Sequence, residues 1–312
     1  MMMLWLRTIC AALLITMLAI GIVSCGGDEA DTPGGRLRIV TTTGMIEDAV
    51  REIVGDRATV TSLMGPGVDP HLYKATQGDL SRLTGADIVF YNGLHLEGKM
   101  VEALEHLGRT RNVIAVTDGI PRGQLRRPAD FNGNYDPHVW FDVRLWSMAV
   151  RLIGDSLASV DTVNARYYRD RTDAYVHRLD SLDSWVRTQI ASIPQSGRVL
   201  ITAHDAFGYF GRAYAIDVRG LQGISTVSEF GLADLGALVD TIVVRRVKAV
   251  FLETSVPRRS IEALVEGVRA KGHDVAVGGS LYSDAMGERG SPEGTYIGMV
   301  TANVRTIAGA LR

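Results

Sequence analysis

The chain contains 312 residues, of which 46% are hydrophobic and 22% are charged, and its formal net charge is −2. This length and composition predict a globular protein with a substantial core, divided into two lobes. The near-neutral net charge gives no indication of nucleic-acid binding, so we expect no nucleic-acid partner.

The first 25 residues have the pattern of an export signal. Arg7 precedes an apolar run from Ile9 to Val23, and small residues follow at Ser24-Cys25-Gly26-Gly27. A basic start, a short apolar stretch and small residues at its end are typical of a signal peptide. The run is shorter than the roughly 20 apolar residues that a transmembrane helix needs. We therefore expect export to the periplasm or the cell surface.

Cys25 is the predicted point of attachment to a membrane. The segment Ile22-Val23-Ser24-Cys25 resembles the bacterial lipobox, in which the cysteine becomes the lipidated first residue of the mature protein. An uncleaved membrane anchor and a plain signal peptide with an incidental cysteine are the alternatives. Residues 26–36 are polar and glycine-rich, which predicts a flexible tether ahead of a folded domain that begins at Leu37.

Cysteine usage limits the chemistry of the folded domain. The chain has two cysteines, Cys10 and Cys25, and both lie in the N-terminal segment. The folded domain therefore has no disulfide and no thiolate ligand. Any metal site within it has to use histidine and carboxylate side chains.

The first part of the folded domain alternates between predicted strands and helices, and we assign residues 37–160 to a first lobe. Strands that alternate with helices indicate βαβ units and a parallel sheet. The hydrophobic pattern predicts strands at Leu37–Thr42, Ala58–Met64, Asp87–Asn92 and Asn112–Val116, and helices at Met45–Val54, Thr76–Leu83 and Glu97–Leu107.

A long helical segment follows. From Arg144 to Ile193 the sequence has no strand pattern, and Asp161–Ile193 carries its apolar residues at helical spacing. Pro194 and Gly197 end the pattern. We predict a helix at 161–194 that links the first lobe to a second lobe.

The alternation resumes in residues 195–312, which we assign to the second lobe. The predicted strands are Arg198–Thr202, Asp217–Leu221, Ala249–Leu252 and Asp274–Val277, and the predicted helices are Ala206–Tyr214, Ala233–Arg246, Arg258–Ala270 and Gly294–Leu311. The predicted fold class is α/β: two lobes with parallel sheets, joined by one long backbone helix, with a cleft between the lobes.

The tripeptide Asp-Pro-His occurs twice, at Asp69-Pro70-His71 and Asp136-Pro137-His138. Proline fixes its own φ and pushes the preceding residue toward an extended conformation, so a histidine just after it points in a defined direction. We interpret both histidines as ligands of one metal site. Asp69 and Asp136 either stabilise their turns or accept a hydrogen bond from a ligating imidazole, and the sequence does not decide between these roles.

His204 and Asp284 are the predicted ligands from the second lobe. His204 directly follows a predicted strand, and Asp284 lies beyond the last one. In open parallel sheets, ligands bind outside the carboxyl ends of the strands. Together with His71 and His138, these residues make a site of three histidines and one carboxylate at the cleft.

This donor set suits a divalent transition metal. Imidazole favours zinc, whereas a carboxylate also admits manganese. Four protein donors close a tetrahedral zinc site and leave no open position for a substrate. A bidentate Asp284 raises the coordination number and favours manganese or iron instead.

The four remaining histidines have ordinary structural explanations. A single histidine is more often a surface residue or a hydrogen-bonded core residue than a ligand. We therefore expect no metal role for four residues: His95, His106, His177 and His273.

The motifs around the four predicted ligands resemble those of the zinc/manganese solute-binding proteins of bacterial ABC transporters, the TroA-like family. The matching segments are Gly-Val-Asp-Pro-His-Leu-Tyr at His71, Asp-Pro-His-Val-Trp-Phe-Asp at His138, Thr-Ala-His-Asp-Ala-Phe-Gly at His204 and Ser-Asp-Ala-Met-Gly at Asp284. The resemblance covers essentially all of Leu37–Arg312. It implies two lobes with a backbone helix, a metal held between them by these four residues, and delivery of the metal to a membrane permease. We expect a monomer attached to the membrane through its lipid.

Two departures from the family pattern bear on the metal. Many zinc-specific members have a long loop rich in His and Asp between the first two ligands, whereas Thr117–Tyr135 contains no histidine. Manganese-specific members usually have Glu at the third ligand position, where this chain has His204. The three-histidine set favours Zn²⁺, with Mn²⁺ second and Fe²⁺ third.

Other functions need different features. A secreted metallohydrolase needs an open coordination position and a general base, for which Glu229 or Glu253 can be proposed, although neither lies in a recognisable catalytic motif. A binding protein for a chelated metal needs an aromatic or Arg-lined cleft rather than four protein donors. A role in cell adhesion is compatible with export, but no sequence feature indicates it. We therefore predict a binding protein and not an enzyme.

Overall fold

The computed structural model describes residues 36–129 and 131–312. The predicted signal peptide, Cys25 and residues 26–35 of the tether lie outside the described residues. Residues 37–312 form one compact unit. No described helix combines the length and the apolar character that crossing a membrane requires.

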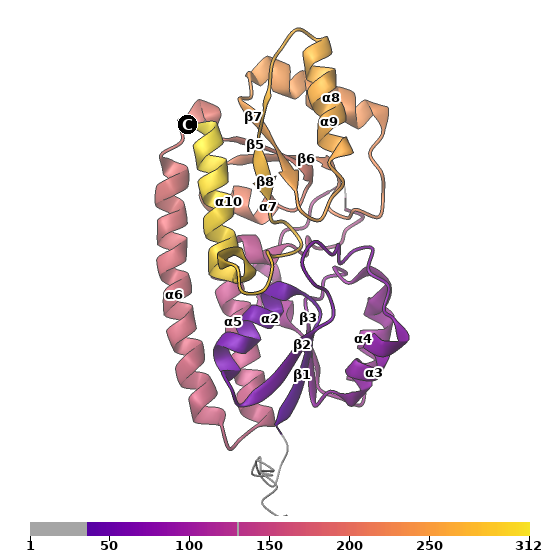
Figure 1. The fold of residues 1–312 in the computed structure, drawn as a ribbon, viewed down its shortest axis with the longest axis vertical. Helices are drawn as coiled ribbons and strands as arrows, with labels where there is room; N and C mark the ends of the chain where they lie inside the picture. The colour runs from indigo at the N-terminus through magenta and orange to yellow at the C-terminus, as the bar shows by residue number, and fades with distance from the viewer. Residues whose placement is uncertain (1–35, 130) are drawn as a thin grey trace, which may run out of the picture. The chain divides into compact units, whose positions relative to one another are not determined.

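The first lobe contains a four-stranded parallel sheet in the order β2-β1-β3-β4 (Figure 1). The central strand β1 is buried from Ile39 onward, as expected for a parallel sheet with helices on both faces. The strands are β1 Leu37–Thr41, β2 Ala58–Ser62, β3 Ile88–Tyr91 and β4 Val113–Ala115, and the helices are α2 Gly44–Val54, α3 Gln77–Gly85 and α4 Val101–Gly108.

The second lobe repeats this design with the order β6-β5-β7-β8, again all parallel. Its central strand β5 is buried along its whole length. The strands are β5 Val199–His204, β6 Asp217–Gln222, β7 Ala249–Glu253 and β8 Ala276–Leu281, and the helices are α7 Gly208–Tyr214, α8 Leu232–Arg245, α9 Arg259–Ala270 and α10 Tyr296–Leu311.

The last strand differs from its predicted range. We predicted Asp274–Val277, whereas β8 runs from Ala276 to Leu281. Gly278 and Gly279 have low strand propensity and therefore indicate a break. In the fold they remain in the strand beside a register shift at Val250/Phe251, and a side chain at Gly278 would clash with the Phe251 ring.

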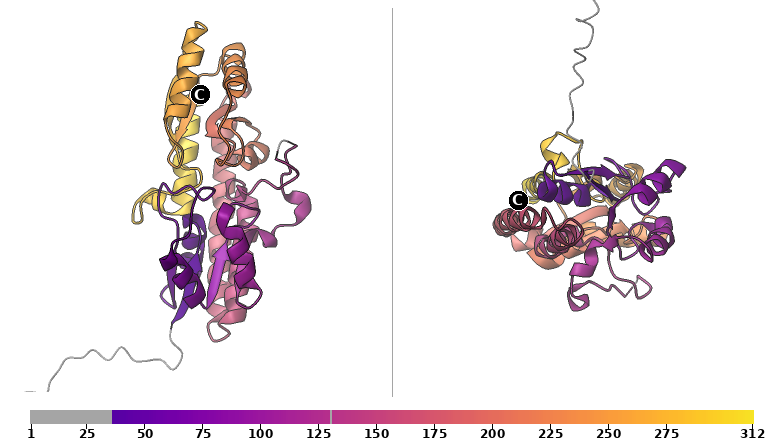
Figure 2. Two further views of the ribbon diagram at one scale, coloured as in Figure 1. Left: turned by 90° about the vertical axis from the view of Figure 1, so that its right-hand side faces the viewer. Right: turned by 90° about the horizontal axis from the view of Figure 1, so that it is seen from below.

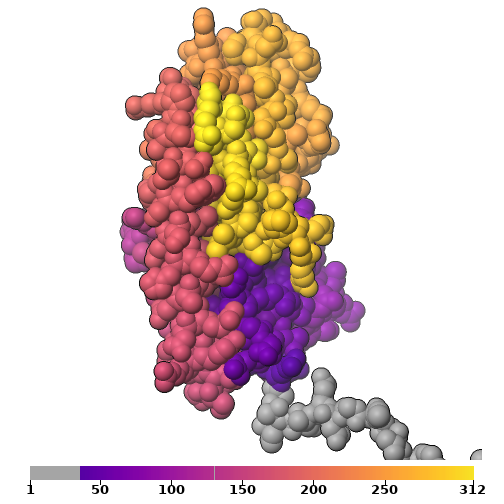
Figure 3. All heavy atoms as spheres, turned by 60° about the vertical axis from the view of Figure 1, so that its left-hand side comes forward, coloured from indigo at the N-terminus to yellow at the C-terminus, as the bar shows by residue number. Residues whose placement is uncertain are grey.

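Helix α5 Val143–Val160 is the last helix of residues 37–160, and helix α6 Ala165–Ala191 follows it and joins the lobes. The predicted helix at 161–194 begins later because Asp161 caps a turn: its carboxylate accepts hydrogen bonds from the Asn164 backbone N–H, the Asn164 amide and the Tyr168 hydroxyl. The 27 residues of α6 span about 40 Å. Helix α6 packs against α5, α2, α7 and α10, and so contacts both lobes (Figures 1 and 2). Figure 3 shows α6 and α10 side by side on one face.

The packing of the lobes directs the carboxyl ends of several strands toward one region between them. Strand β5 ends at His204, β7 ends at Glu253, and β8 ends three residues before Asp284. The loop after β2 leads to His71. This arrangement brings titratable side chains from both lobes to a common site.

Candidate metal centre

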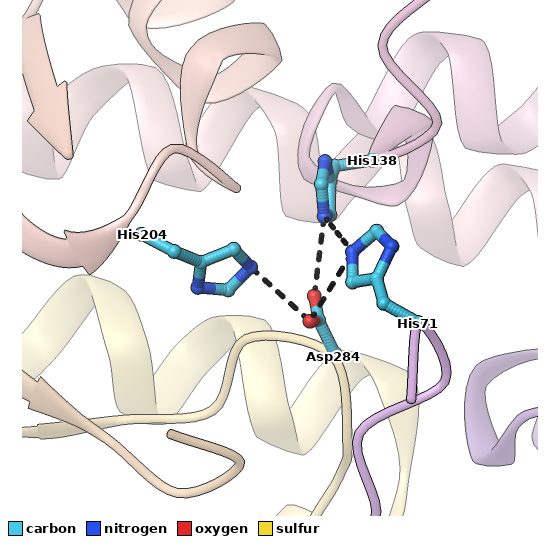
Figure 4. A group of neighbouring side chains, drawn as sticks. All are labelled: His71, His138, His204 and Asp284. Atoms are coloured by element: carbon cyan, nitrogen blue, oxygen red, sulfur yellow. Dashed lines mark hydrogen bonds and ion pairs between the residues drawn. The ribbon is translucent and has the colours of Figure 1, made fainter. Parts of the chain in front are cut away.

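Four buried side chains converge between the lobes: His71, His138, His204 and Asp284 (Figure 4). Their candidate ligand atoms all lie within 4.8 Å of one another. None of the four residues is more than 3% exposed. The structure therefore brings together all four residues that the sequence singled out as ligands, two from each lobe.

The spacing of the donor atoms fits a single small cation. The Nε2 atoms of His71 and His138 are 3.3 Å apart. Asp284 Oδ1 lies 3.4 Å from His138 Nε2, and Asp284 Oδ2 lies 3.1 Å from His204 Nε2. A tetrahedron with metal–ligand bonds of about 2.0–2.1 Å has edges of about 3.3 Å. These three separations are close to that length, whereas His71 Nε2 lies farther from Asp284 Oδ2, at 3.8 Å.

Asp284 provides a second test of the fit. Both of its carboxylate oxygens are buried, and neither accepts a hydrogen bond of acceptable geometry from the described part of the chain. A buried carboxylate that lacks such partners is costly unless a cation compensates it. Imidazole nitrogens of three histidines lie around it, so the donor set is suited to a divalent metal.

The second Asp-Pro-His corner, residues 136–138, holds its histidine by the ring. Asp136 Oδ1 lies 2.8 Å from His138 Nδ1 and also accepts a hydrogen bond from the His138 backbone N–H at 2.9 Å. The other oxygen of Asp136 pairs with Arg126. Both roles considered for Asp136 are therefore present: it stabilises the turn and it orients the imidazole so that Nε2 faces the site.

The first Asp-Pro-His corner, residues 69–71, is built differently. Asp69 Oδ1 accepts a hydrogen bond from the His71 backbone N–H at 2.9 Å, which is the turn-stabilising role. No hydrogen bond joins Asp69 to the His71 ring. The other oxygen of Asp69 instead accepts a hydrogen bond from the Thr226 hydroxyl of the second lobe, at 2.6 Å.

His204 is oriented by Glu253, a residue from the neighbouring strand. Glu253 Oε2 lies 2.6 Å from His204 Nδ1, and Oε1 accepts a hydrogen bond from the His204 backbone N–H at 2.9 Å. Both residues end their strands, β5 and β7, which pair with each other. Parallel pairing therefore places the carboxylate beside the imidazole at the end of the sheet.

The loop that carries Asp284 is fixed to both lobes. The indole N–H of Trp140, near the second corner, donates to the Ser283 carbonyl at 3.1 Å. The hydroxyls of Ser283 and Ser255 are 2.8 Å apart. These contacts place Asp284 opposite the histidines of the first lobe.

The electrostatics of the site separate His71 from the other histidines. Burial lowers the pKa of His71 to about 3. Burial also opposes a charge on His138, but the hydrogen bond with Asp136 and the charge of Asp284 outweigh it and raise that pKa to about 9. For His204, Glu253 and Asp284 overcome burial and raise the pKa well above its ordinary value. Burial disfavours the charged form of Asp284, but His204 and His138 hold its pKa well below the usual range.

The other histidines lie away from the cluster, as expected. His95, His106 and His177 are exposed, and His273 is half-buried. Of the two glutamates considered as a general base, Glu229 is exposed and Glu253 is occupied by His204. Neither of these two glutamates is therefore a freely accessible base beside the site.

Sequence reasoning missed several supporting residues. Glu253 was considered only as a base, although its position at the end of a predicted strand next to the His204 strand was a usable signal. The pairing of Arg126 with Asp136, ten residues apart, and of Thr226 with Asp69, 157 residues apart, had no signal because no sequence pattern marks these side chains as partners.

Comparison with known proteins agrees with this geometry. The family model described as ZnuA, the periplasmic zinc-uptake complex component A, matches residues 39–310. The chain belongs to this family. It is therefore a solute-binding component of an ABC-type importer and not an enzyme, which confirms the function predicted from the sequence. The comparisons do not support the hydrolase alternative.

Individual members of the family are similar over nearly their whole length. The manganese-binding lipoprotein MntA of Bacillus subtilis is 48% identical over 303 residues, which cover 97% of this chain and 98% of that protein. The zinc-binding protein TroA of Treponema pallidum is 47% identical over 303 residues, with the same coverage. The solved structure of the Treponema pallidum protein superposes with a TM-score of 0.87 at 49% identity and covers 89% of this chain and 99% of that one. This likeness confirms the predicted two-lobe fold.

Proposed function

We propose that this protein captures one divalent transition metal ion at His71, His138, His204 and Asp284 and delivers it to the permease of an ABC importer. One observation carries the proposal: four buried residues from two lobes bring their candidate ligand atoms within 4.8 Å of one another. The burial of all four residues encloses the ion, which suits capture and transport rather than turnover.

We propose Zn²⁺ as the preferred cargo, with Mn²⁺ second and Fe²⁺ third. Three imidazoles and one carboxylate oxygen make a complete tetrahedral zinc site. Both oxygens of Asp284 face the histidines, however, so the carboxylate can also bind in bidentate fashion and provide a fifth donor. The similar proteins include one named for manganese and one named for zinc, which supports keeping both metals in the test.

We further propose that the chain is exported, anchored through a lipid on Cys25 and active as a monomer. The motif at residues 22–25 supports lipidation, and the similar MntA is named a lipoprotein. Replacement of Cys25 by Ser tests the anchor. The variant should move from the membrane fraction to the soluble extracytoplasmic fraction, and retention in the membrane would contradict the proposal.

Metal content is the direct test of the site. The purified protein should retain about one equivalent of metal per chain, measured by elemental analysis, and calorimetric competition between Zn²⁺ and Mn²⁺ at one pH should rank the two. The double variant His71→Ala/His204→Ala should lose the metal. His177→Ala is the matched control, because His177 is exposed on α6. Full metal content in the double variant would refute the assigned site.

A further inference from the structure

The three histidines of the site differ in what holds their rings. A carboxylate lies against Nδ1 of His138 and of His204, at 2.8 Å and 2.6 Å. Within residues 36–129 and 131–312, neither a hydrogen bond nor an ion pair joins a carboxylate to Nδ1 of His71. The position of His71 must therefore be set through its backbone, and the backbone N–H of His71 is held by Asp69.

Asp69 in turn is held from the second lobe. Its Oδ2 accepts a hydrogen bond from Thr226 Oγ1 at 2.6 Å, between residues that are 157 positions apart in the sequence. Thr226 is only 8% exposed. Among the described residues, two side-chain interactions connect residues 65–75 to the second lobe: this hydrogen bond and the ion pair of His71 with Asp284.

Thr226 is itself connected to the strand end that carries another ligand. The Gln222 amide donates to the Thr226 carbonyl at 2.9 Å. Gln222 ends β6 and pairs in register with His204 at the end of β5. A short chain of contacts therefore runs from the His204 strand pair through Thr226 and Asp69 to the backbone of His71.

The second corner does not depend on a single contact of this kind. The Tyr209 hydroxyl of α7 donates to the Asp136 carbonyl at 2.9 Å, and the Asn92 amide donates to the Pro137 carbonyl at 3.1 Å. The adjacent rings of Phe141 and Phe207 stack at 4.2 Å across the lobes. Loss of one hydroxyl leaves this corner in place, whereas loss of the Thr226 hydroxyl leaves Asp69 without its contact to the second lobe.

We propose that Thr226 is a positioning residue for the metal site: its hydroxyl, acting through Asp69, holds the first corner against the second lobe and keeps His71 on the ion. The inference rests on the proposed function. It predicts that the hydroxyl controls how fast the metal leaves, because His71 is the ligand whose ring has no carboxylate support of its own. Among the described residues, no hydrogen bond joins the Thr226 hydroxyl to a metal ligand, so the effect of the hydroxyl must pass through Asp69.

The test measures the rate of metal dissociation from Zn²⁺-loaded protein in excess chelator. Thr226→Val keeps the shape of the side chain but removes the donor, and we expect about tenfold faster dissociation for the loss of a hydrogen bond to a carboxylate. Thr226→Ser keeps the hydroxyl and should dissociate at the wild-type rate. Thr172→Val is the matched control, because the buried Thr172 hydroxyl bonds within α6, and it should leave the rate unchanged.

Asp69→Asn tests the same contact from the other side and remains informative if Thr226→Val does not fold. It should also accelerate dissociation, and the double variant with Thr226→Val should be no faster than the faster single variant, because both changes break one interaction. An unchanged rate in Thr226→Val, or equal acceleration by Thr226→Ser, would overturn the inference. Wild-type protein that holds no metal would instead overturn the proposed function, so the two failures are distinguishable.

Discussion

The two Asp-Pro-His corners share a tripeptide, and both place a buried histidine at the same site, yet their aspartates make different contacts. Asp136 contacts the ring of His138, while Arg126 and Tyr209 fix the corner from outside. Asp69 contacts only the backbone of His71 and uses its second oxygen for Thr226. A repeated motif thus fixes the direction in which a histidine points, while the surroundings decide how firmly it is held.

The difference has a consequence for a protein that must bind a metal and later release it. A ligand whose ring is fixed by a carboxylate is organised before the metal arrives, which increases affinity. A ligand held through its backbone and one contact between lobes can leave the ion when that contact breaks. If Thr226 positions His71 as proposed, the second corner should contribute more to binding strength, and the first corner should be the place where the site opens.

The largest expected effect comes from removing the histidine of each corner. Both His138→Ala and His71→Ala should lower metal affinity by more than the roughly 10- to 100-fold typical of losing an outer hydrogen-bond partner. The loss should be greater for His138, because it is the better organised ligand and its removal leaves Asp136 without its imidazole. Competition with a chelator of known affinity measures both. A larger loss of metal affinity in His71→Ala than in His138→Ala would contradict the expected difference between the corners.

Substitution of the aspartates should follow the same order: the loss of metal affinity should be greater at the second corner than at the first. Asp136→Asn should lower affinity about 10- to 100-fold, because it removes the charge that supports His138 and pairs with Arg126. Asp69→Asn should lower affinity by less, mainly through faster dissociation, because the His71 ring does not depend on it. Titration calorimetry and dissociation rates separate the two effects. Circular dichroism of both variants serves as the control for folding.

Much of the site could be predicted because its ligands carry local signals. The prolines before His71 and His138 and the strand before His204 fix the backbone locally, and the rule that parallel strands present ligands at their carboxyl ends brings such residues together. Hydrophobic alternation likewise predicted most elements of both sheets. The lobes and the four candidate ligands therefore follow from features within a few residues of each position.

The remaining features depend on contacts that no sequence pattern marks, some of them local and some between distant segments. The start of α6 at Ala165 is set by the bonds that Asp161 makes with Asn164 and Tyr168, and the extent of β8 depends on its pairing with β7. The partner of Asp69 is Thr226, 157 positions away in the sequence, whereas the partner of Asp136 is Arg126, ten positions away. No pattern in the sequence around either aspartate distinguishes the two.

A smaller effect is expected in the dependence of metal affinity on pH. In the absence of metal, His138 carries a proton below a pKa of about 9, whereas His71, with a pKa of about 3, is neutral near pH 7. A metal must displace the proton of His138 and also that of His204, whose pKa is raised well above its ordinary value, but none at His71. Affinity should therefore fall about tenfold per pH unit for each displaced proton as the pH drops below 9. Competition measurements from pH 6 to 9, corrected for protonation of the chelator, test this expectation. Asp136→Asn should flatten the dependence, and a pH-independent affinity would contradict it.

The smallest expected effect is a difference in the motion of the two corners. It can be measured on the wild-type protein, without substituting any ligand. Hydrogen exchange of residues 65–75 should slow on metal binding, because the ion attaches His71 to Asp284 and so reinforces the single Asp69–Thr226 contact. Residues 134–139 should change less, since Tyr209, Asn92 and Arg126 already hold them without metal. Mass spectrometry of metal-free and Zn²⁺-loaded protein measures both segments in one experiment. If metal binding slowed exchange equally in the two segments, the corners would be equally rigid. That result would contradict the expectation that the second corner provides binding strength while the first corner opens.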